Sequence, residues 1–159
     1  MPEDKKVFVE DLNLRTRINL ISKAYHQMVD STQHTIAILR ECKNKWERRC
    51  SLTPTEVKLI VANGIKVIVQ PSSNRCYTED EFQDVGAVIQ EDVTEASVIF
   101  GVKEVPMENL MSNKTYFFFS HTIKAQDYNM PLLDRLLELN VRMVDFECIR
   151  EKKVEGKIP

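Results

Sequence analysis

Glycine is scarce in this sequence. The 159 residues include four glycines, Gly64, Gly86, Gly101 and Gly156. None of them belongs to a Gly-x-Gly-x-x-Gly pattern, the turn that lets a backbone approach the pyrophosphate of a dinucleotide. The chain therefore lacks an evident nucleotide-binding domain, and we expect no dinucleotide cofactor to bind this chain alone.

Three further absences narrow the range of functions. The formal net charge is -2, which gives no electrostatic basis for binding nucleic acid or an anionic membrane. No apolar run approaches the roughly 20 residues that a membrane-spanning helix needs. The four cysteines form no Cys-x-x-Cys pair and have no histidine at metal-ligand spacing, so we expect free thiols and no metal site.

The first 34 residues have no strand pattern. They contain five basic and five acidic side chains, whereas a mitochondrial presequence is rich in arginine and poor in acids. Only the stretch Arg15–Val29 resembles a basic amphipathic helix. We expect residues 1–34 to be an N-terminal extension, partly helical or disordered, and their weak targeting signal leaves a cytoplasmic location open.

Short apolar runs alternate with helix signals from residue 35 onward. Thr53-Pro-Thr-Glu56 opens a helix with a capping box and with proline at the first helical position, and Thr78-Glu-Asp-Glu81 opens a second. A third helix is expected over residues 129–140. The six expected strands cover residues 35–40, 65–69, 87–89, 97–101, 115–120 and 141–145. This alternation predicts an α/β fold.

The expected architecture is an open, mostly parallel sheet with helices on both faces, as in Rossmann and flavodoxin-like layering. The domain covers residues 35–148, and residues 149–159 form a charged tail. In such sheets, ligands bind beyond the carboxyl ends of the strands. The side chains that follow the strands there include Arg49, Lys103, His121, Lys124 and Glu147. They predict a cationic pocket for an anionic or zwitterionic substrate.

Each of these side chains also has a purely structural interpretation. A single histidine after a strand is more often bonded within its loop than catalytic, and a loop lysine is more often solvated. Arg49 has glutamates nearby with which it can form ordinary exposed ion pairs. For Trp46, in the loop after the first strand, we expect a packing role. Residue patterns alone leave these alternatives open.

Five segments together resemble a known family, in order and at matching intervals. They resemble the N-terminal part of lysine–ketoglutarate reductase, the saccharopine-forming half of animal aminoadipic semialdehyde synthase. More distantly, they resemble lysine-forming saccharopine dehydrogenase and the N-terminal domain of alanine dehydrogenase and nicotinamide nucleotide transhydrogenase. The resemblance covers residues 35–148. The segments are Lys45–Arg49 with Leu52–Pro54, Val69–Ser72, Gln90–Asp92, Gly101–Glu104 and Phe119–Gln126.

The resemblance implies a reductive condensation of lysine with 2-oxoglutarate to saccharopine, with NADP(H) as the cofactor. It implies that Lys103 and His121 form the acid/base pair, and that Arg49 and Lys124 bind substrate carboxylates. Glu104 and Glu147 would then moderate the positive charge of the pocket. A planar guanidinium suits bidentate carboxylate binding. Residence in mitochondria is also implied.

The chain departs from this family in lacking the nucleotide-binding domain, which leaves its status as an enzyme uncertain. One hypothesis is that it is the substrate-binding part of a saccharopine-forming reductase, inactive alone. The alternative is a non-catalytic binding or regulatory module that retains the saccharopine or 2-oxoglutarate pocket. Docking to a nucleotide-binding domain or to a second copy of the chain is compatible with both hypotheses.

Overall fold

The computed structural model describes residues 34–149. The expected N-terminal extension and charged tail lie outside these residues, apart from His34 and Ile149. Six strands carry the fold: β1 (Thr35–Ile38), β2 (Lys66–Val69), β3 (Val88–Ile89), β4 (Val98–Phe100), β5 (Thr115–Phe118) and β6 (Arg142–Asp145). Three α-helices accompany them: α2 (Pro54–Ala62), α3 (Glu79–Gln83) and α4 (Met130–Glu138). Within residues 34–149, no helix combines the length and the apolar composition that crossing a membrane requires.

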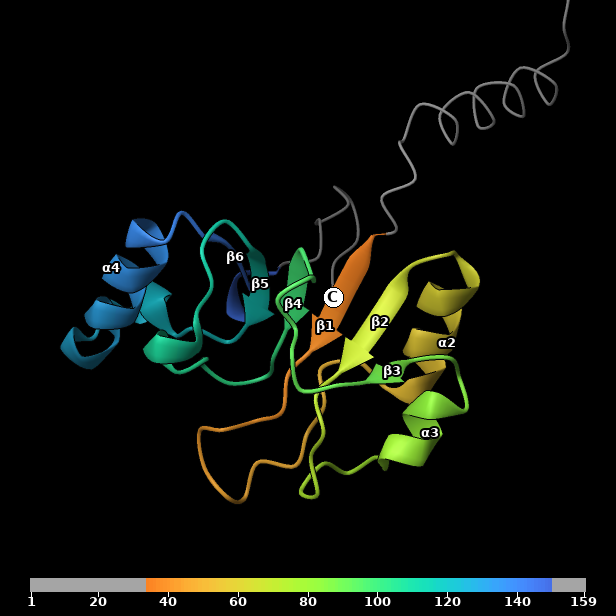
Figure 1. The fold of residues 1–159 in the computed structure, drawn as a ribbon. Coiled ribbons are helices and arrows are strands. Elements are labelled where there is room, and N and C mark those ends of the chain that lie inside the picture. Colours follow the sequence, from red (N-terminus) through yellow and green to blue (C-terminus); the bar gives the residue numbers. More distant parts are fainter. Residues whose placement is uncertain (1–33, 150–159) are drawn as a thin grey trace, which may run out of the picture. The chain divides into compact units, whose positions relative to one another are not determined.

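The strands form one open sheet in the order β3-β2-β1-β4-β5-β6 (Figure 1). Every neighbouring pair of strands is parallel. Ile36 of β1, for example, lies opposite Val67 of β2 on one side and Val98 of β4 on the other. The predicted parallel α/β sheet is therefore confirmed. All six expected strands are present, each somewhat shorter than its apolar run.

Alternating side chains of the strands build two separate cores, because successive residues of a strand point to opposite faces. On one face, Ile36, Ile38, Val67 and Val69 pack with Val57 of α2, Phe82 of α3 and Ala87. On the other face, strand residues pack against Leu132 and Leu136 of α4. Figure 1 shows α2 and α3 beside β2 and β3, and α4 beside β5 and β6. The expected helices on both faces are confirmed.

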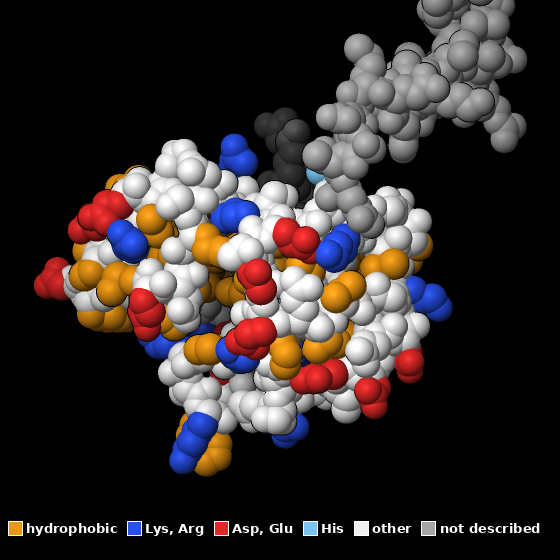
Figure 2. Space-filling model, viewed as in Figure 1, with side chains coloured by type: hydrophobic (Ala, Val, Ile, Leu, Met, Phe, Trp, Pro, Cys, Tyr) orange, Lys and Arg blue, Asp and Glu red, His pale blue; other side chains and the backbone are white. Residues whose placement is uncertain are grey.

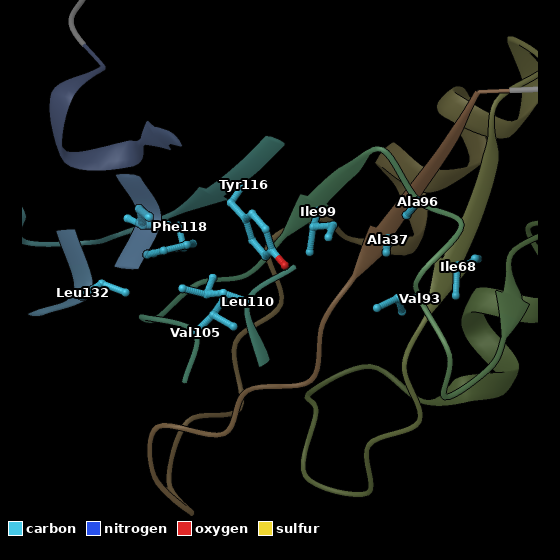
Figure 3. Close-up of a cluster of buried hydrophobic side chains, with 11 residues drawn as sticks. Ala37, Ile68, Val93, Ala96, Ile99, Val105, Leu110, Tyr116, Phe118 and Leu132 are labelled. Carbon is cyan, nitrogen blue, oxygen red and sulfur yellow. The ribbon is translucent and has the colours of Figure 1, made fainter. Parts of the chain in front are cut away.

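The second core spans five strands and the loop that follows β4. Figure 3 shows Ala37, Ile68, Ile99, Tyr116 and Phe118 along it, together with residues of the surrounding loops. The hydroxyl of Tyr116 accepts a hydrogen bond at 3.0 Å from the backbone N–H of Met111, so this buried phenol is satisfied. This hydrogen bond therefore ties the loop after β4 to strand β5.

The predicted helix starts follow from local chemistry. Thr53 and Thr78 are the N-caps of α2 and α3, and the carboxylates of Glu56 and Glu81 accept from their backbone N–H groups at 2.8 and 2.7 Å. Gly64, with φ of +80°, follows the end of α2 in the left-handed conformation that glycine adopts without strain. The third helix is shorter than residues 129–140, because a 3₁₀ turn over Asp127–Asn129 precedes it.

Strand β1 is where the direction of the sheet reverses. The chain first passes to β2 and β3 on one side, and then returns to β4, β5 and β6 on the other. The loops that leave the carboxyl ends of β1 and β4 consequently diverge. Parallel sheets bind ligands in the crevice that such a divergence opens.

Candidate functional site

Three of the predicted site residues contact one another at the carboxyl ends of β5 and β6. The Nδ1 atom of His121 lies 3.0 Å from Oε2 of Glu147. The Nζ atom of Lys124 lies 2.8 Å from the other carboxylate oxygen of Glu147 and 3.2 Å from Nδ1 of His121. His121 and Lys124 belong to the loop after β5, whereas Glu147 follows β6. The sheet therefore brings residues 26 positions apart into one cluster.

Electrostatics within this cluster favour the charged forms of both partners of His121. Lys124 above all, and His121 in addition, lower the pKa of the Glu147 carboxyl. Glu147 in turn raises the pKa of Lys124. The cluster therefore contains a carboxylate and an ammonium group directly beside an imidazole, an arrangement suited to moving a proton at a ring nitrogen.

His121 adopts the left-handed backbone conformation, which residues other than glycine generally avoid. His121 has φ of +58° and Ala125, four residues later, has φ of +50°. The left-handed conformation costs a residue with a Cβ atom roughly 1–2 kcal/mol, because Cβ crowds the carbonyl oxygen. Such residues persist only where the surroundings hold them, and they are frequent at functional sites.

A second group of predicted residues lies after β1 and β4. Arg49 forms a two-pronged contact with Glu47, from Nε to Oε1 at 2.7 Å and from Nη2 to Oε2 at 2.6 Å. This contact lowers the pKa of Glu47 to about 2, and the charge of Lys103 contributes a smaller part. Arg49 and Lys103 thus share one electrostatic neighbourhood, with Glu47 between them.

Lys103 is positioned through its backbone by a glutamate that follows β1. Glu41 Oε1 accepts from the N–H of Val102 at 2.7 Å, and Oε2 accepts from the N–H of Lys103 at 2.9 Å. Beyond Leu39, the chain that leaves β1 turns away from β4. The Glu41 carboxylate then accepts the two hydrogen bonds that backbone carbonyls of a neighbouring strand would otherwise accept. Burial raises the pKa of Glu41, although both N–H groups oppose this shift. Glu104, the next predicted site residue, forms an ion pair in which its Oε2 lies 3.7 Å from Nζ of Lys43.

Two cavities border these residues, one on each side of the stretch Gly101–Lys103. The first, of about 370 Å³, is lined by Lys103, Glu104, Glu41 and residues of the loop after β4. The second, of about 470 Å³, is lined by Arg49, Val102, Phe119 and other residues that follow β1, β2 and β6. The ring of Phe119 is stacked with the imidazole of His121 at a centroid distance of 6.5 Å. Phe119 therefore links His121, which lines neither cavity, to the cavity that Arg49 lines.

The expectation of a cationic pocket needs revision, because acidic partners accompany the basic residues. The pairing of Arg49 with Glu47 is the ion pair that the structural interpretation of Arg49 expected, whereas the contact of Glu41 with the backbone of Lys103 was missed by sequence reasoning. Figure 2 shows the same mixture on a larger scale, with side chains of both charge signs interspersed over the face in view. The packing role expected for Trp46 is wrong, since its side chain is 77 % exposed and Lys45 lies over its ring.

Residues 34–149 contain no Gly-x-Gly-x-x-Gly turn. The connections from β1 to α2 and from β2 to α3 contain no glycine, and Gly64 and Gly86 follow the ends of α2 and α3 at the opposite edge of the sheet. At Gly101, an added Cβ would meet no atom closer than 3.6 Å, so glycine is not needed there for space. Nor do residues 34–149 hold a group of three or more His, Cys, Asp or Glu side chains arranged for a metal ion.

The open, parallel sheet with helices on both faces defines an α/β domain of the alanine dehydrogenase N-terminal type. Residues 37–158 match the model of the family "Alanine dehydrogenase/PNT, N-terminal domain", and the chain belongs to this family. It is similar to a solved L-alanine dehydrogenase, with a TM-score of 0.62 and 20% identity over 71% of this chain and 32% of that one. At this identity, the likeness concerns the fold alone.

Relatives with curated names are more similar in sequence. The mitochondrial alpha-aminoadipic semialdehyde synthase of Rattus norvegicus is 51% identical over 112 residues, which are 70% of this chain and 12% of the relative. The NAD(+)-dependent, L-lysine-forming saccharopine dehydrogenase of Yarrowia lipolytica is 31% identical over 110 residues, 66% of this chain and 30% of the relative. The chain thus spans a small part of the length of the proteins that it matches.

Proposed function

We propose that this chain is the substrate-binding part of a saccharopine-forming lysine–2-oxoglutarate reductase. The observation that carries the proposal is the meeting of predicted site residues at the carboxyl edge of the sheet, in a chain 51% identical to a named semialdehyde synthase. Saccharopine has several carboxylates and a secondary amine, which suit arginine and lysine partners together with proton-transferring groups.

In this proposal, His121 and Lys103 transfer protons during the condensation of the lysine amine with the keto group. His121 is suited to the task because its ring nitrogen lies 3.0 Å from the Glu147 carboxylate, which can stabilise an imidazolium. Arg49 binds one substrate carboxylate bidentately, as it now binds Glu47. Lys124 binds another carboxylate, while Glu104 and Glu147 offset the positive charge.

The hydride for such a reduction comes from a reduced nicotinamide dinucleotide. Because residues 34–149 contain no Gly-x-Gly-x-x-Gly turn, we propose that a nucleotide-binding domain outside these residues or from a partner supplies it. NADP(H) is the cofactor that the family resemblance implies. The mitochondrial name of the rat relative supports a mitochondrial location for this chain.

A second candidate is a non-catalytic module that binds saccharopine or 2-oxoglutarate. The absence of a Gly-x-Gly-x-x-Gly turn within residues 34–149 supports this module over a free-standing enzyme. In this role, the same side chains bind the ligand, and Lys103 and His121 recognise it without transferring protons.

Calorimetric titration of the 159-residue chain with saccharopine, with 2-oxoglutarate and with NADPH tests both candidates. We expect saccharopine to bind and NADPH not to bind. Lys103→Met and His121→Ala are compared with Lys58→Met and His34→Ala, which make the same changes on the exposed side of α2 and before β1. Each site variant should weaken saccharopine binding by about tenfold or more, because it removes a charged or hydrogen-bonded partner.

Lysine-dependent NADPH oxidation separates the candidates. Turnover after addition of a nucleotide-binding domain supports the reductase, whereas saccharopine binding that never leads to turnover supports the module. A folded chain that binds neither saccharopine nor 2-oxoglutarate contradicts both.

A further inference from the structure

The buried side chain of Ser120 holds the turn that carries His121. Sequence reasoning gave this serine no role. Ser120 is completely buried. Its hydroxyl donates a hydrogen bond to Oδ2 of Asp145, at the end of β6, and accepts one from the backbone N–H of Thr122 at 3.1 Å. These hydrogen bonds hold Ser120 and Thr122 in place. His121 therefore lies between two fixed neighbours.

Asp145 fixes the other half of the cluster as well. Its second oxygen, Oδ1, accepts from the backbone N–H of Glu147 at 2.8 Å. One carboxylate therefore holds the turn of His121 with one oxygen and the turn of Glu147 with the other. The turns of the two side chains that meet at 3.0 Å are therefore both hydrogen-bonded, directly or through Ser120, to the half-buried carboxylate of Asp145.

The surface contacts of the cluster are too weak to replace this buried support. The side chains of His121 and Glu147 are 26% and 27% exposed, and that of Lys124 is 48% exposed. Exposed ion pairs contribute little because water and salt screen them and because long side chains lose entropy on pairing. A left-handed backbone at His121 needs an interaction shielded from water, and Ser120 provides it.

We propose that Ser120 and Asp145 are positioning residues that hold His121 and Glu147 in contact. The proposal rests on the proposed function only in treating His121 as a site residue. A hydrogen bond across two adjacent parallel strands thereby fixes the relative placement of a base and its carboxylate partner. Pre-organisation of this kind determines whether a binding or catalytic group stands in its productive place.

The test replaces Ser120 by alanine in the 159-residue chain, with Ser112→Ala as the matched control. Ser112 is an exposed serine in the loop before β5, at the opposite edge of the sheet. Nuclear magnetic resonance follows the backbone resonances of His121 and the titration of the Glu147 carboxyl. Calorimetry measures saccharopine binding to the same samples.

In Ser120→Ala, we expect the His121 resonances to move and the pKa of Glu147 to rise towards its ordinary value. Saccharopine binding should weaken on the order of tenfold, as expected when a site group loses its support. Ser112→Ala should match the wild type in all three measurements. Unchanged His121 resonances and an unchanged Glu147 titration in folded Ser120→Ala would overturn the proposal.

Two further outcomes are decisive in their own way. If the wild type does not bind saccharopine but the His121 and Glu147 signals move in Ser120→Ala, the proposed function fails and the positioning role stands. If Ser120→Ala does not fold, Asp145→Asn provides the same measurements. That variant keeps the shape of the side chain but leaves one acceptor oxygen for two donors, so a folded Asp145→Asn with wild-type signals also overturns the proposal.

Discussion

The clearest quantitative prediction concerns Glu41, whose carboxylate accepts the N–H groups of Val102 and Lys103 at 2.7 and 2.9 Å. Glu41→Ala removes both acceptors. Val102 is 6% exposed, so its N–H stays without a partner, whereas Lys103 is half-buried and water can reach its N–H. Hydrogen bonds to a charged group contribute about 1.5–3 kcal/mol, and a buried orphan donor costs about 1–3 kcal/mol.

The variant also recovers part of this loss, because the burial that raises the pKa of Glu41 shows that the charged carboxylate is itself costly to bury. We therefore expect Glu41→Ala to reduce the free energy of unfolding by about 2 kcal/mol. With a urea slope of about 1.5 kcal/mol/M, the unfolding midpoint falls by roughly 1.3 M. Hydrogen exchange at the Val102 and Lys103 amides should accelerate with it.

The matched control is Glu108→Ala, at an exposed glutamate in the 3₁₀ turn Met107–Asn109. It removes the same charge near the same cavity and should change the free energy of unfolding by less than about 0.5 kcal/mol. If Glu41→Ala behaves like Glu108→Ala, or if the two amides remain as protected as in the wild type, the carboxylate does not support the loop after β4.

Three other predictions concern stability. Phe82→Ala should lower the free energy of unfolding by about 3–5 kcal/mol in urea titrations, because the ring is completely buried between α3 and the sheet; a loss below 1 kcal/mol contradicts this packing. Thr78→Ala should cost about 1 kcal/mol by removing the N-cap oxygen that accepts from Glu81, and circular dichroism melting will check it. Glu47→Gln should cost about 1 kcal/mol at pH 7, a modest value because Arg49 is largely exposed. Since the folded pKa of Glu47 is depressed from 4.5 to about 2, this difference is present above pH 4.5 and is lost as the pH falls through 2; an undiminished difference at pH 1 contradicts the ion pair.

The strands and helix starts could be predicted from the sequence because their causes are local. Apolar runs of three or more residues indicate buried strands, and Thr53 and Thr78 each have a glutamate three positions later to complete a cap. Three strands, β1, β4 and β5, end one or two residues before the expected position. Leu39 still donates to Phe100, but β1 then leaves the sheet, and apolar character alone does not reveal that departure.

The supports of Lys103 and His121 could not be predicted, because they depend on contacts between distant parts of the chain. Glu41 is 62 residues from Lys103, and Ser120 is 25 residues from Asp145. Nothing near these positions distinguishes a serine that supports a turn from an ordinary loop serine. The expected packing role of Trp46 is wrong because a general trend does not hold here. Large aromatic residues are usually buried, but the loop after β1 leaves the sheet and exposes this ring to solvent.

The built-in carboxylates change how a charged ligand would be recognised at this edge. Arg49 already binds a carboxylate, that of Glu47, and Lys124 already binds that of Glu147. An incoming carboxylate must therefore replace an existing partner, so one charge-assisted pair is exchanged for another and the net gain in free energy is small. Attraction between opposite charges then contributes little selectivity. Discrimination must come instead from whether all the ligand's groups reach their partners at once, which depends on the fixed spacing of β1, β4, β5 and β6. Glu41, Ser120 and Asp145 hold the loops that follow these strands, so under the proposed function they matter to recognition as much as the residues that would touch the ligand.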